Sequence, residues 1–278
     1  MSSSTKWHKT LVIVLGLVLS VSWLYPFIIV LLGSFKTRSE IFTNTLFTLF
    51  LPEEPTTENY PRAYENLDFA QSFLNSLFIT VVSILVIVVF SSMAAYALSR
   101  NKSKFSSAIY FFCAIIMLVP FQSVMIPLVS LFGSVGMLNR IGLIFMNLGF
   151  ASSMSIFLYY GALRSIPQTL DEAAFLDGAN PFQIFWRVIF PILKPTTVTV
   201  IILNAIRIWN DYLLPSLVIN RDGMYTIPLQ MYYFFGEYTI QWELALAGLM
   251  LAIIPIIILY IFLQKYIVEG VTEGATKQ

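Results

Sequence analysis

Six long apolar stretches dominate this sequence and restrict the folds it can adopt. A helix of about 20 apolar residues spans the roughly 30 Å hydrocarbon core of a membrane, and each stretch reaches about that length. Only helices and closed barrels satisfy the backbone in lipid, and these stretches are too long and too continuously apolar for barrel strands. The sequence therefore predicts an all-α, polytopic membrane protein with six transmembrane helices, over residues 11–32, 73–98, 107–132, 141–163, 196–219 and 244–263.

The composition points to the same solvent. Hydrophobic residues make up 58% of the chain and charged residues 11%, and the mean hydropathy is +0.79. That leaves too little polar surface to cover a water-soluble protein of 278 residues. The net charge of +1 indicates no nucleic-acid partner. The only cysteine is Cys113 and the only histidine is His8, so we expect neither an internal disulfide nor a metal site.

The first apolar stretch follows Lys6 and Lys9 and superficially resembles a secretory signal. A signal peptide has a shorter apolar region and small residues at its cleavage site, where this chain has Trp23, Tyr25 and Pro26. We therefore expect an uncleaved membrane helix.

The distribution of Lys and Arg predicts the orientation of the six helices. With the N-terminus inside, the cytoplasmic segments carry ten of these residues and the opposite side carries five, so the positive-inside rule places both termini in the cytoplasm. The cytoplasmic ten are Lys6, Lys9, Arg100, Lys102, Lys104, Arg164, Arg187, Lys194, Lys265 and Lys277, and the outer five are Lys36, Arg38, Arg62, Arg140 and Arg221. The outer segment 33–72, with three prolines and an acidic cluster, is either a surface cap that contacts a partner or a solvated loop.

The cytoplasmic segment 164–195 has the pattern of two short helices separated by a turn. Pro167 fits the first turn of one helix and Gly178 permits a left-handed stop. Asn180 followed by Pro181 predicts an N-cap and first residue of the next helix. The second helix has one apolar face, made by Phe182, Phe185, Trp186 and Ile189, that can pack under the membrane helices.

The first of these helices presents a small and acidic surface. Its residues are Leu170, Ala173 and Ala174 on one side, with Asp171, Glu172 and Asp177 nearby. A helix lying on lipid head groups normally has a basic face, whereas no base occurs between Ser165 and Gly178. We therefore expect this helix to dock onto another protein.

The string EAAFLDGANPFQIFWRVIFP, residues 172–191, resembles the conserved loop of ABC importer permeases of type I. It departs from the family pattern in Val188 and Phe190, which keep the apolar character. The resemblance implies a coupling helix that docks on an ATPase. The coupling residues would be Glu172, Ala173, Ala174, Asp177, Gly178 and Pro191.

Other segments resemble the maltose-type carbohydrate branch of these permeases, and specifically the smaller second permease of the pair. They are Phe73-Leu74-Asn75-Ser76, Ile126-Pro127-Leu128, Trp209-Asn210-Asp211-Tyr212 and the tail from Gln264 to Lys277. On this interpretation residues 1–32 are the N-terminus and first helix, 33–70 an outer loop, 71–264 the permease domain, and 265–278 a cytoplasmic tail. The protein would lie in a bacterial or archaeal plasma membrane.

The chain has no Gly-x-x-x-x-Gly-Lys-Ser/Thr loop to hold nucleotide phosphates. We therefore expect no cofactor in this subunit, with ATP and Mg²⁺ bound by partner ATPases. The resemblance implies a heterodimer with a second permease, both surrounded by membrane lipid. Two ATPase subunits would bind below it, and an extracytoplasmic solute-binding protein would deliver a sugar substrate from above.

Two further groups of residues are candidates for contact with the partners. The outer loop 220–243 resembles the element that reaches toward the binding protein, with Arg221, Asp222, Gly223, Met224, Gly236, Glu237 and Tyr238 as its candidates. An ordinary interhelical loop is the alternative. Candidate pathway residues are Trp209, Asn210, Asp211 and Tyr212, although Asp211 is also explained by its neighbour Arg207 or by a helix–helix hydrogen bond.

Three rival functions stay open on the sequence. An ABC permease for a non-sugar solute has the same Glu-Ala-Ala loop. An ion-coupled secondary transporter would need ionisable groups within the membrane, and the apolar stretches offer only Arg207 and Asp211, which can neutralise each other. A membrane scaffold without transport is the third.

Overall fold

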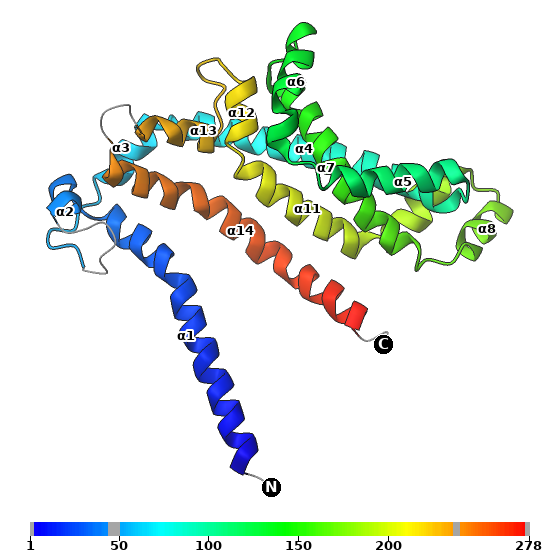
Figure 1. Cartoon of the computed structure of the whole chain (residues 1–278), viewed down its shortest axis with the longest axis horizontal. Helices are drawn as coiled ribbons and strands as arrows, with labels where there is room; N and C mark the ends of the chain where they lie inside the picture. The colour runs from blue at the N-terminus through cyan, green and yellow to red at the C-terminus, as the bar shows by residue number, and fades with distance from the viewer. Residues whose placement is uncertain (1–2, 44–50, 236–239, 276–278) are drawn as a thin grey trace. The chain divides into compact units, whose positions relative to one another are not determined.

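A computed structural model of the chain describes residues 3–43, 51–235 and 240–275, and it has no β-strand in these residues (Figure 1). The all-α prediction is confirmed. The first half contains α1 (Ser3–Ser34), α2 (Arg38–Thr43), α3 (Asn59–Asn66), α4 (Phe69–Arg100), α5 (Lys104–Ile116), α6 (Phe121–Ser134) and α7 (Arg140–Leu163). The second half contains α8 (Thr169–Leu176), α9 (Pro181–Ile184), the π-helix η1 (Phe185–Ile189), α10 (Phe190–Ile192), α11 (Lys194–Trp209), α12 (Leu213–Val218), α13 (Ile227–Met231), the 3₁₀-helix η2 (Tyr232–Phe234) and α14 (Trp242–Ala275).

Four helices in the described residues are long and apolar enough to cross a membrane by themselves. They cover Lys9–Ser34, Phe69–Arg100, Arg140–Leu163 and Trp242–Phe262. Two bent helix pairs bring the number of spans to as many as six: α5 with α6, at an angle of 108°, and the segment Pro181–Ile192 with α11, at 77°. The predicted stretches all lie on helical segments, but two of them are not single straight helices.

The stretch 107–132 is interrupted at residues 117–120, between α5 and α6. Pro120 has the extended backbone angles of an N-cap, with φ −67° and ψ 139°. A proline has no N–H to continue the preceding helix and disfavours the helical conformation in the residue before it. Hydropathy alone does not register this break, because the residues on both sides are apolar.

The stretch 196–219 is divided as well. Helix α11 ends at Trp209, and the Asp211 carboxylate then accepts a hydrogen bond from the backbone N–H of Leu214 at 3.3 Å, at the start of α12. Asp211 lies one residue before Tyr212, the N-cap residue of α12, so its side chain bonds to the first turn from just outside the helix. Asp211 therefore marks the boundary between α11 and α12.

The chain divides into two compact units. Unit 1 comprises Met1–Ala70 and Gln230–Ile254, and unit 2 comprises Gln71–Leu229 and Pro255–Gln278. In unit 1, the Asn59 side chain donates to the backbone carbonyls of Ser34 and Lys36, both at 2.9 Å. The segment predicted as an outer loop thus contains α2 and α3 and is held to the end of α1.

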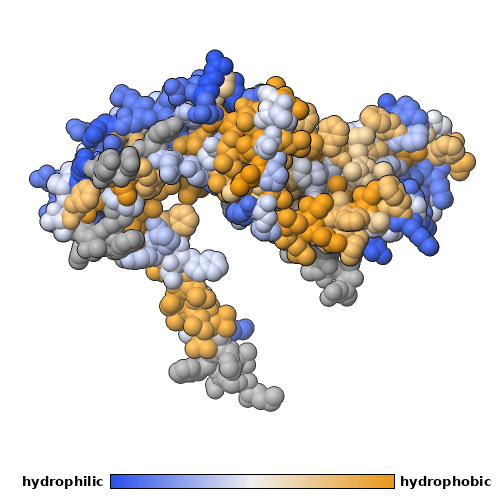
Figure 2. Space-filling view, turned by 45° about the horizontal axis from the view of Figure 1, so that its top comes forward, coloured by the Kyte–Doolittle hydropathy of each residue, from blue (hydrophilic) through white to orange (hydrophobic). Residues whose placement is uncertain are grey.

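The core of unit 2 is built mainly from α4, α7 and α11. Its most buried side chains include Ile87, Leu143, Tyr159, Leu163 and Val200, each with 0% exposure. Helix α5 runs beside α7, and α8 lies at one end of the unit (Figure 1). Figure 2 shows hydrophilic residues gathered at this end, next to a largely hydrophobic surface. Helix α8 therefore lies at the hydrophilic end of unit 2, beyond the apolar surface of the long helices.

Candidate functional site

Helix α8 is ended by a glycine in a left-handed conformation. Gly178 has φ +84°, its N–H donates to the carbonyl of Phe175, and the N–H of Ala179 donates to the carbonyl of Ala174, both at 3.0 Å. These two bonds form a Schellman motif, which satisfies the last carbonyls of a helix and reverses the chain. The predicted stop is therefore present. The helix begins at Thr169, so Pro167 precedes it and does not lie within it.

The next helix begins as predicted. The Asn180 side chain accepts from the Gln183 N–H at 2.9 Å, the Gln183 side chain accepts from the Asn180 N–H at 3.0 Å, and Pro181 is the first residue. This reciprocal pair is a capping box, which satisfies two N–H groups that a helix start leaves without partners. The direction in which the chain leaves α8 is thus set by local bonds.

Helix α9 continues into η1, whose wider turn precedes Pro191. Proline cannot donate to the carbonyl four residues earlier, and a π-turn accommodates that interruption. Phe185 and Ile189 are buried at 3% and 0% exposure, which agrees with the predicted apolar face. Phe182 is 62% exposed, so it does not belong to that face. In the single chain it lies one turn too early to reach the core.

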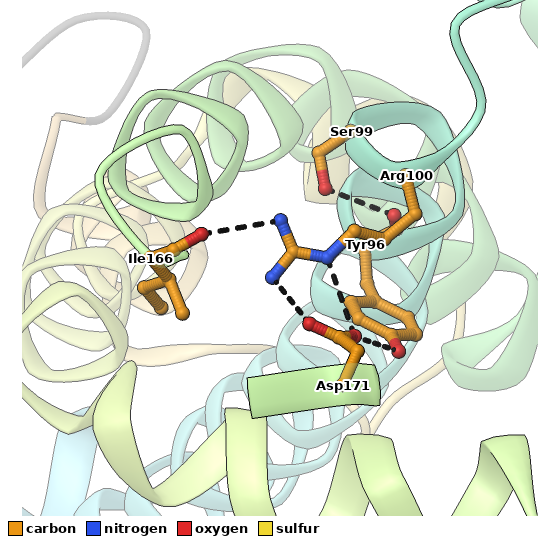
Figure 3. A network of polar contacts seen from close by, with 5 residues as sticks. All are labelled: Tyr96, Ser99, Arg100, Ile166 and Asp171. Carbon is orange, nitrogen blue, oxygen red and sulfur yellow. Dashed lines mark hydrogen bonds and ion pairs between the residues drawn. The ribbon is translucent and has the colours of Figure 1, made fainter. Parts of the chain in front are cut away.

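A polar cluster fixes α8 to the end of α4 (Figure 3). Arg100, the last residue of α4, forms an ion pair from Nη2 to Asp171 Oδ2 at 2.9 Å, and its Nε donates to Asp171 Oδ1 at 3.3 Å. The Nη1 group donates to the Ile166 carbonyl at 3.4 Å, and the hydroxyl of Tyr96 donates to Asp171 Oδ1. The two charged side chains are only 17% and 16% exposed. A pair this shielded from water is screened less than a surface pair.

Aromatic packing extends the cluster to η1. The guanidinium of Arg100 lies 5.6 Å from the ring centre of Tyr96, within the range of a cation–π contact. The Tyr96 ring in turn lies 5.2 Å from that of Phe185. Helix α8 also packs against α9 and η1. The end of α4, α8 and η1 therefore form one packed group.

The structure corrects the predicted acidic surface of α8 at Asp171. This carboxylate points toward Arg100 and Tyr96 (Figure 3), so it is not available to a partner. The residues that do face outward are Glu172, Ala173, Phe175, Leu176 and Asp177, while Ala174 is half-buried. Phe175 and Leu176 are 65% and 85% exposed, so the outward surface is apolar with two flanking acids.

The sequence interpretation missed Tyr96 and Arg100 as members of this site. Arg100 was counted only as a positive charge at the cytoplasmic end of a helix. The sequence carries no local signal that pairs it with Asp171, because 71 positions separate the two residues. No helical spacing relates residues that far apart.

The four candidate pathway residues have different surroundings. Trp209 is buried, at 5% exposure, and packs edge-on against Phe73 with ring centres 5.8 Å apart. Asn210 is exposed, and Asp211 and Tyr212 are half-buried. Within the described residues Asp211 forms no ion pair with Arg207, and the structure adds another contact for it, the hydrogen bond from the Leu214 N–H in the first turn of α12.

The candidate binding-protein residues fall partly within the described chain. Arg221, Asp222 and Gly223 are exposed, and Met224 is half-buried. Gly223 has φ +74°, which suits a tight turn. Gly236, Glu237 and Tyr238 lie outside the described residues.

Comparison with known families decides the class of protein. Residues 87–273 match the family described as binding-protein-dependent transport system inner membrane component. That match covers α8, its Gly178 stop and the α4 end with Arg100. The chain belongs to this family. It is a membrane-embedded transport permease subunit, and the family does not itself carry out catalysis.

Curated relatives match over nearly the whole length. The probable starch degradation products transport system permease protein AmyC of Thermoanaerobacterium thermosulfurigenes is 53% identical over 98% of this chain and 98% of its own. The multiple sugar-binding transport system permease protein MsmG of Streptococcus mutans is 37% identical, over 98% and 96%. The melibiose/raffinose/stachyose import permease protein MelC of Bacillus subtilis is 33% identical, over 96% of each. The resemblance to the carbohydrate branch is therefore confirmed.

Solved structures give the same fold. A bacterial ABC transporter involved in the import of the acidic polysaccharide alginate contains a chain that matches with a TM-score of 0.82 and 26% identity, over 96% of this chain and 99% of that one. A second, from a bacterial alginate ABC transporter in complex with an alginate pentasaccharide-bound periplasmic protein, matches with a TM-score of 0.69 and 15% identity, over 95% and 96%. The second likeness supports the fold alone.

Proposed function

We propose that this chain forms half of the pathway of an ATP-driven importer for a sugar or oligosaccharide, and that energy enters it through α8. The observation that carries the proposal is the outward surface of α8 around Glu172, Ala173, Phe175 and Leu176, presented by a helix that is itself held by the Arg100–Asp171 ion pair. A docking element must be exposed and must also be unable to move by itself. Helix α8 meets both conditions.

The partners follow from that surface. Two separate ATPase subunits bind α8 and its counterpart on a second homologous permease, with which this chain forms a heterodimer. Glu172 pairs with a base in the ATPase groove, and Phe175 and Leu176 fill an apolar part of it. Closure of the ATPases on ATP moves α8 and shifts the pathway between inward-facing and outward-facing packings. Both termini lie in the cytoplasm, on the side where α8 docks.

The substrate class rests on the relatives. Proteins 53% and 37% identical along their whole length are named for starch degradation products and for multiple sugars. An extracytoplasmic binding protein delivers the sugar to the outer loop around Arg221–Met224. We infer that linear glucose oligosaccharides are the first substrates to test, followed by galactose-containing oligosaccharides such as raffinose.

Uptake by the assembled complex in proteoliposomes tests this function. With ATP enclosed on the ATPase side and sugar-loaded binding protein on the other, labelled maltooligosaccharide should accumulate. Replacing ATP by a non-hydrolysable analogue should stop accumulation, and collapsing proton and sodium gradients should not. Accumulation driven by an ion gradient without ATP would instead establish a secondary transporter, and accumulation of only a non-sugar solute would leave the ABC mechanism but overturn the substrate class.

A further inference from the structure

The outer end of α4 holds the loop that follows α12. Asn75 is 1% exposed, and its amide nitrogen donates to the carbonyls of Gly223 and Tyr225 at 2.9 and 3.0 Å. The hydroxyl of Ser76, 2% exposed, accepts from the N–H of Ile227 at 2.9 Å. Three hydrogen bonds from two adjacent buried residues thus fix the backbone of this loop to α4.

The other half of the Asn75 amide is also engaged. Its Oδ1 accepts from Arg140 Nη1 at 2.9 Å and from Gln71 Nε2 at 3.2 Å. An asparagine amide offers two donors and two acceptor positions, and all four are used here. The orientation of Asn75 is therefore fully determined, with the loop on its donor side and α7 on its acceptor side.

Helix α4 is one continuous helix between this network and the Arg100 cluster. The helix Phe69–Arg100 contains neither proline nor glycine and has no π-turn. Its adjacent serines, Ser91 and Ser92, are the kind of pair found at kinks, but both are buried, at 1% and 0% exposure, and the Ser92 hydroxyl donates to the Val89 carbonyl of the same helix at 3.2 Å. Its buried positions recur every three or four residues, so one face is packed along the length; they are Ser72, Asn75, Ser76, Ile79, Thr80, Ser83, Ile84, Ile87, Val88, Ser91, Ser92 and Ala95. At about 1.5 Å per residue, Asn75 and Arg100 are about 38 Å apart along the axis.

The two ends of α4 hold the two segments that the proposed function assigns to the partners. The outer end holds Gly223–Ile227, next to the exposed residues Arg221 and Asp222, and the inner end holds α8 through Arg100 and Tyr96. We propose that α4 is a rigid link by which the outer loop and α8 move together, with Asn75 and Arg100 as the positioning residues at its two ends. This inference rests on the proposed function, because it supplies the path by which a loaded binding protein outside stimulates ATP hydrolysis inside.

Coupling of this kind is reciprocal and runs in series. A displacement of the loop shifts α4 and α8 together, and an ATP-driven displacement of α8 repositions the loop by the same route. Once the loop is released from Asn75, or α8 is released from Arg100, the link is already broken. Releasing the other end as well therefore lowers the stimulation of ATP hydrolysis no further. Two independent local roles would instead give effects that multiply.

The variants can separate these cases. Asn75→Asp keeps the oxygen that accepts from Arg140 and Gln71 and loses the two N–H groups donated to the loop. Arg100→Lys keeps the charge beside Asp171 and loses the planar fork that also reaches Ile166. Lys102→Gln, which changes an exposed side chain just beyond α4 that is assigned no contact, is the control.

The measurement is the ATPase rate of the reconstituted complex with saturating sugar-loaded binding protein, divided by the rate without it. Each single variant should lower this ratio by about threefold or more, and the double variant should lie within about 1.5-fold of the lower single, as expected for two positions in one unit. The control should match the unmodified chain.

A double variant that shows the product of the single effects, or an Asn75→Asp ratio equal to that of the control, would overturn the link while leaving the importer intact. An unmodified complex that loaded binding protein does not stimulate would overturn the proposed function itself.

Discussion

Two neighbouring carboxylates of α8 face different surroundings. Asp171 is 16% exposed and is held between Arg100 and Tyr96, whereas Glu172 is exposed. Successive residues on a helix point about 100° apart, so one can pack inward while the next faces solvent. Asp171 therefore positions α8, and Glu172 is left for a partner.

Removing the charge of Asp171 should loosen α8 without changing its outward surface. In Asp171→Asn the guanidinium of Arg100 loses its counter-ion in a mostly buried setting, at a cost of about 1–3 kcal/mol. We expect faster proteolysis within residues 164–180 and reduced uptake. The exchange Arg100→Asp with Asp171→Arg restores opposite charges and should recover part of both. A double variant that is worse than either single would show that the pair itself is not what holds α8.

The left-handed conformation of Gly178 should govern which residues can replace it. An added Cβ would meet no atom within 4 Å, so the cost is conformational and amounts to about 1–2 kcal/mol for most residues. Asparagine tolerates this conformation, whereas valine does not. Uptake should therefore fall in the order Gly178, Gly178→Asn, Gly178→Val at equal protein levels. Equal activity of the Asn and Val variants would contradict a left-handed requirement.

At the scale of elements, the sequence predicts the apolar helices from their long hydrophobic runs and the helix ends from local turn residues. It does not predict which side chains far apart in the chain contact each other. The ends of α8 and α9 follow from Gly178, Asn180 and Pro181 because each acts through bonds within five residues. The bend between α5 and α6 was missed because the hydropathy is continuous across Pro120. The pairing of Arg100 with Asp171 was missed because it depends on how α4 and α8 pack, which no local pattern encodes.

The orientation of the helices gives a labelling prediction. In a Cys113→Ser background, a cysteine at exposed Glu54 should react with an impermeant thiol reagent added outside intact cells. A cysteine at Lys102, an exposed position on the predicted cytoplasmic side, should react only after the membrane is opened. Both positions reacting from one side would exclude the orientation that the Lys and Arg distribution predicts.

At the scale of the whole molecule, the chain is the membrane-embedded subunit of a transporter, and the energy for transport must come from a separate subunit. The described part of unit 2 offers a packed core, an exposed α8 at one end and a tethered loop, Gly223–Ile227. None of these features hydrolyses a nucleotide, and the family is one of transport permeases. Purified without partners, the chain should therefore show no more ATP hydrolysis than a control sample that contains detergent and no protein. Robust hydrolysis that follows the chain through purification would contradict this account.

The central claim is that energy enters through the outward surface of α8, and charge reversal at Glu172 tests it most directly. Glu172→Lys places a like charge against a base in the partner, at a docking cost on the order of 3 kcal/mol. Since about 1.4 kcal/mol corresponds to a factor of ten, ATP-dependent sugar uptake should fall by about 100-fold at equal membrane levels. Glu54→Lys, which reverses another exposed carboxylate far from α8 in sequence, should transport normally. Normal uptake by Glu172→Lys would contradict the assignment of α8 as the site of coupling.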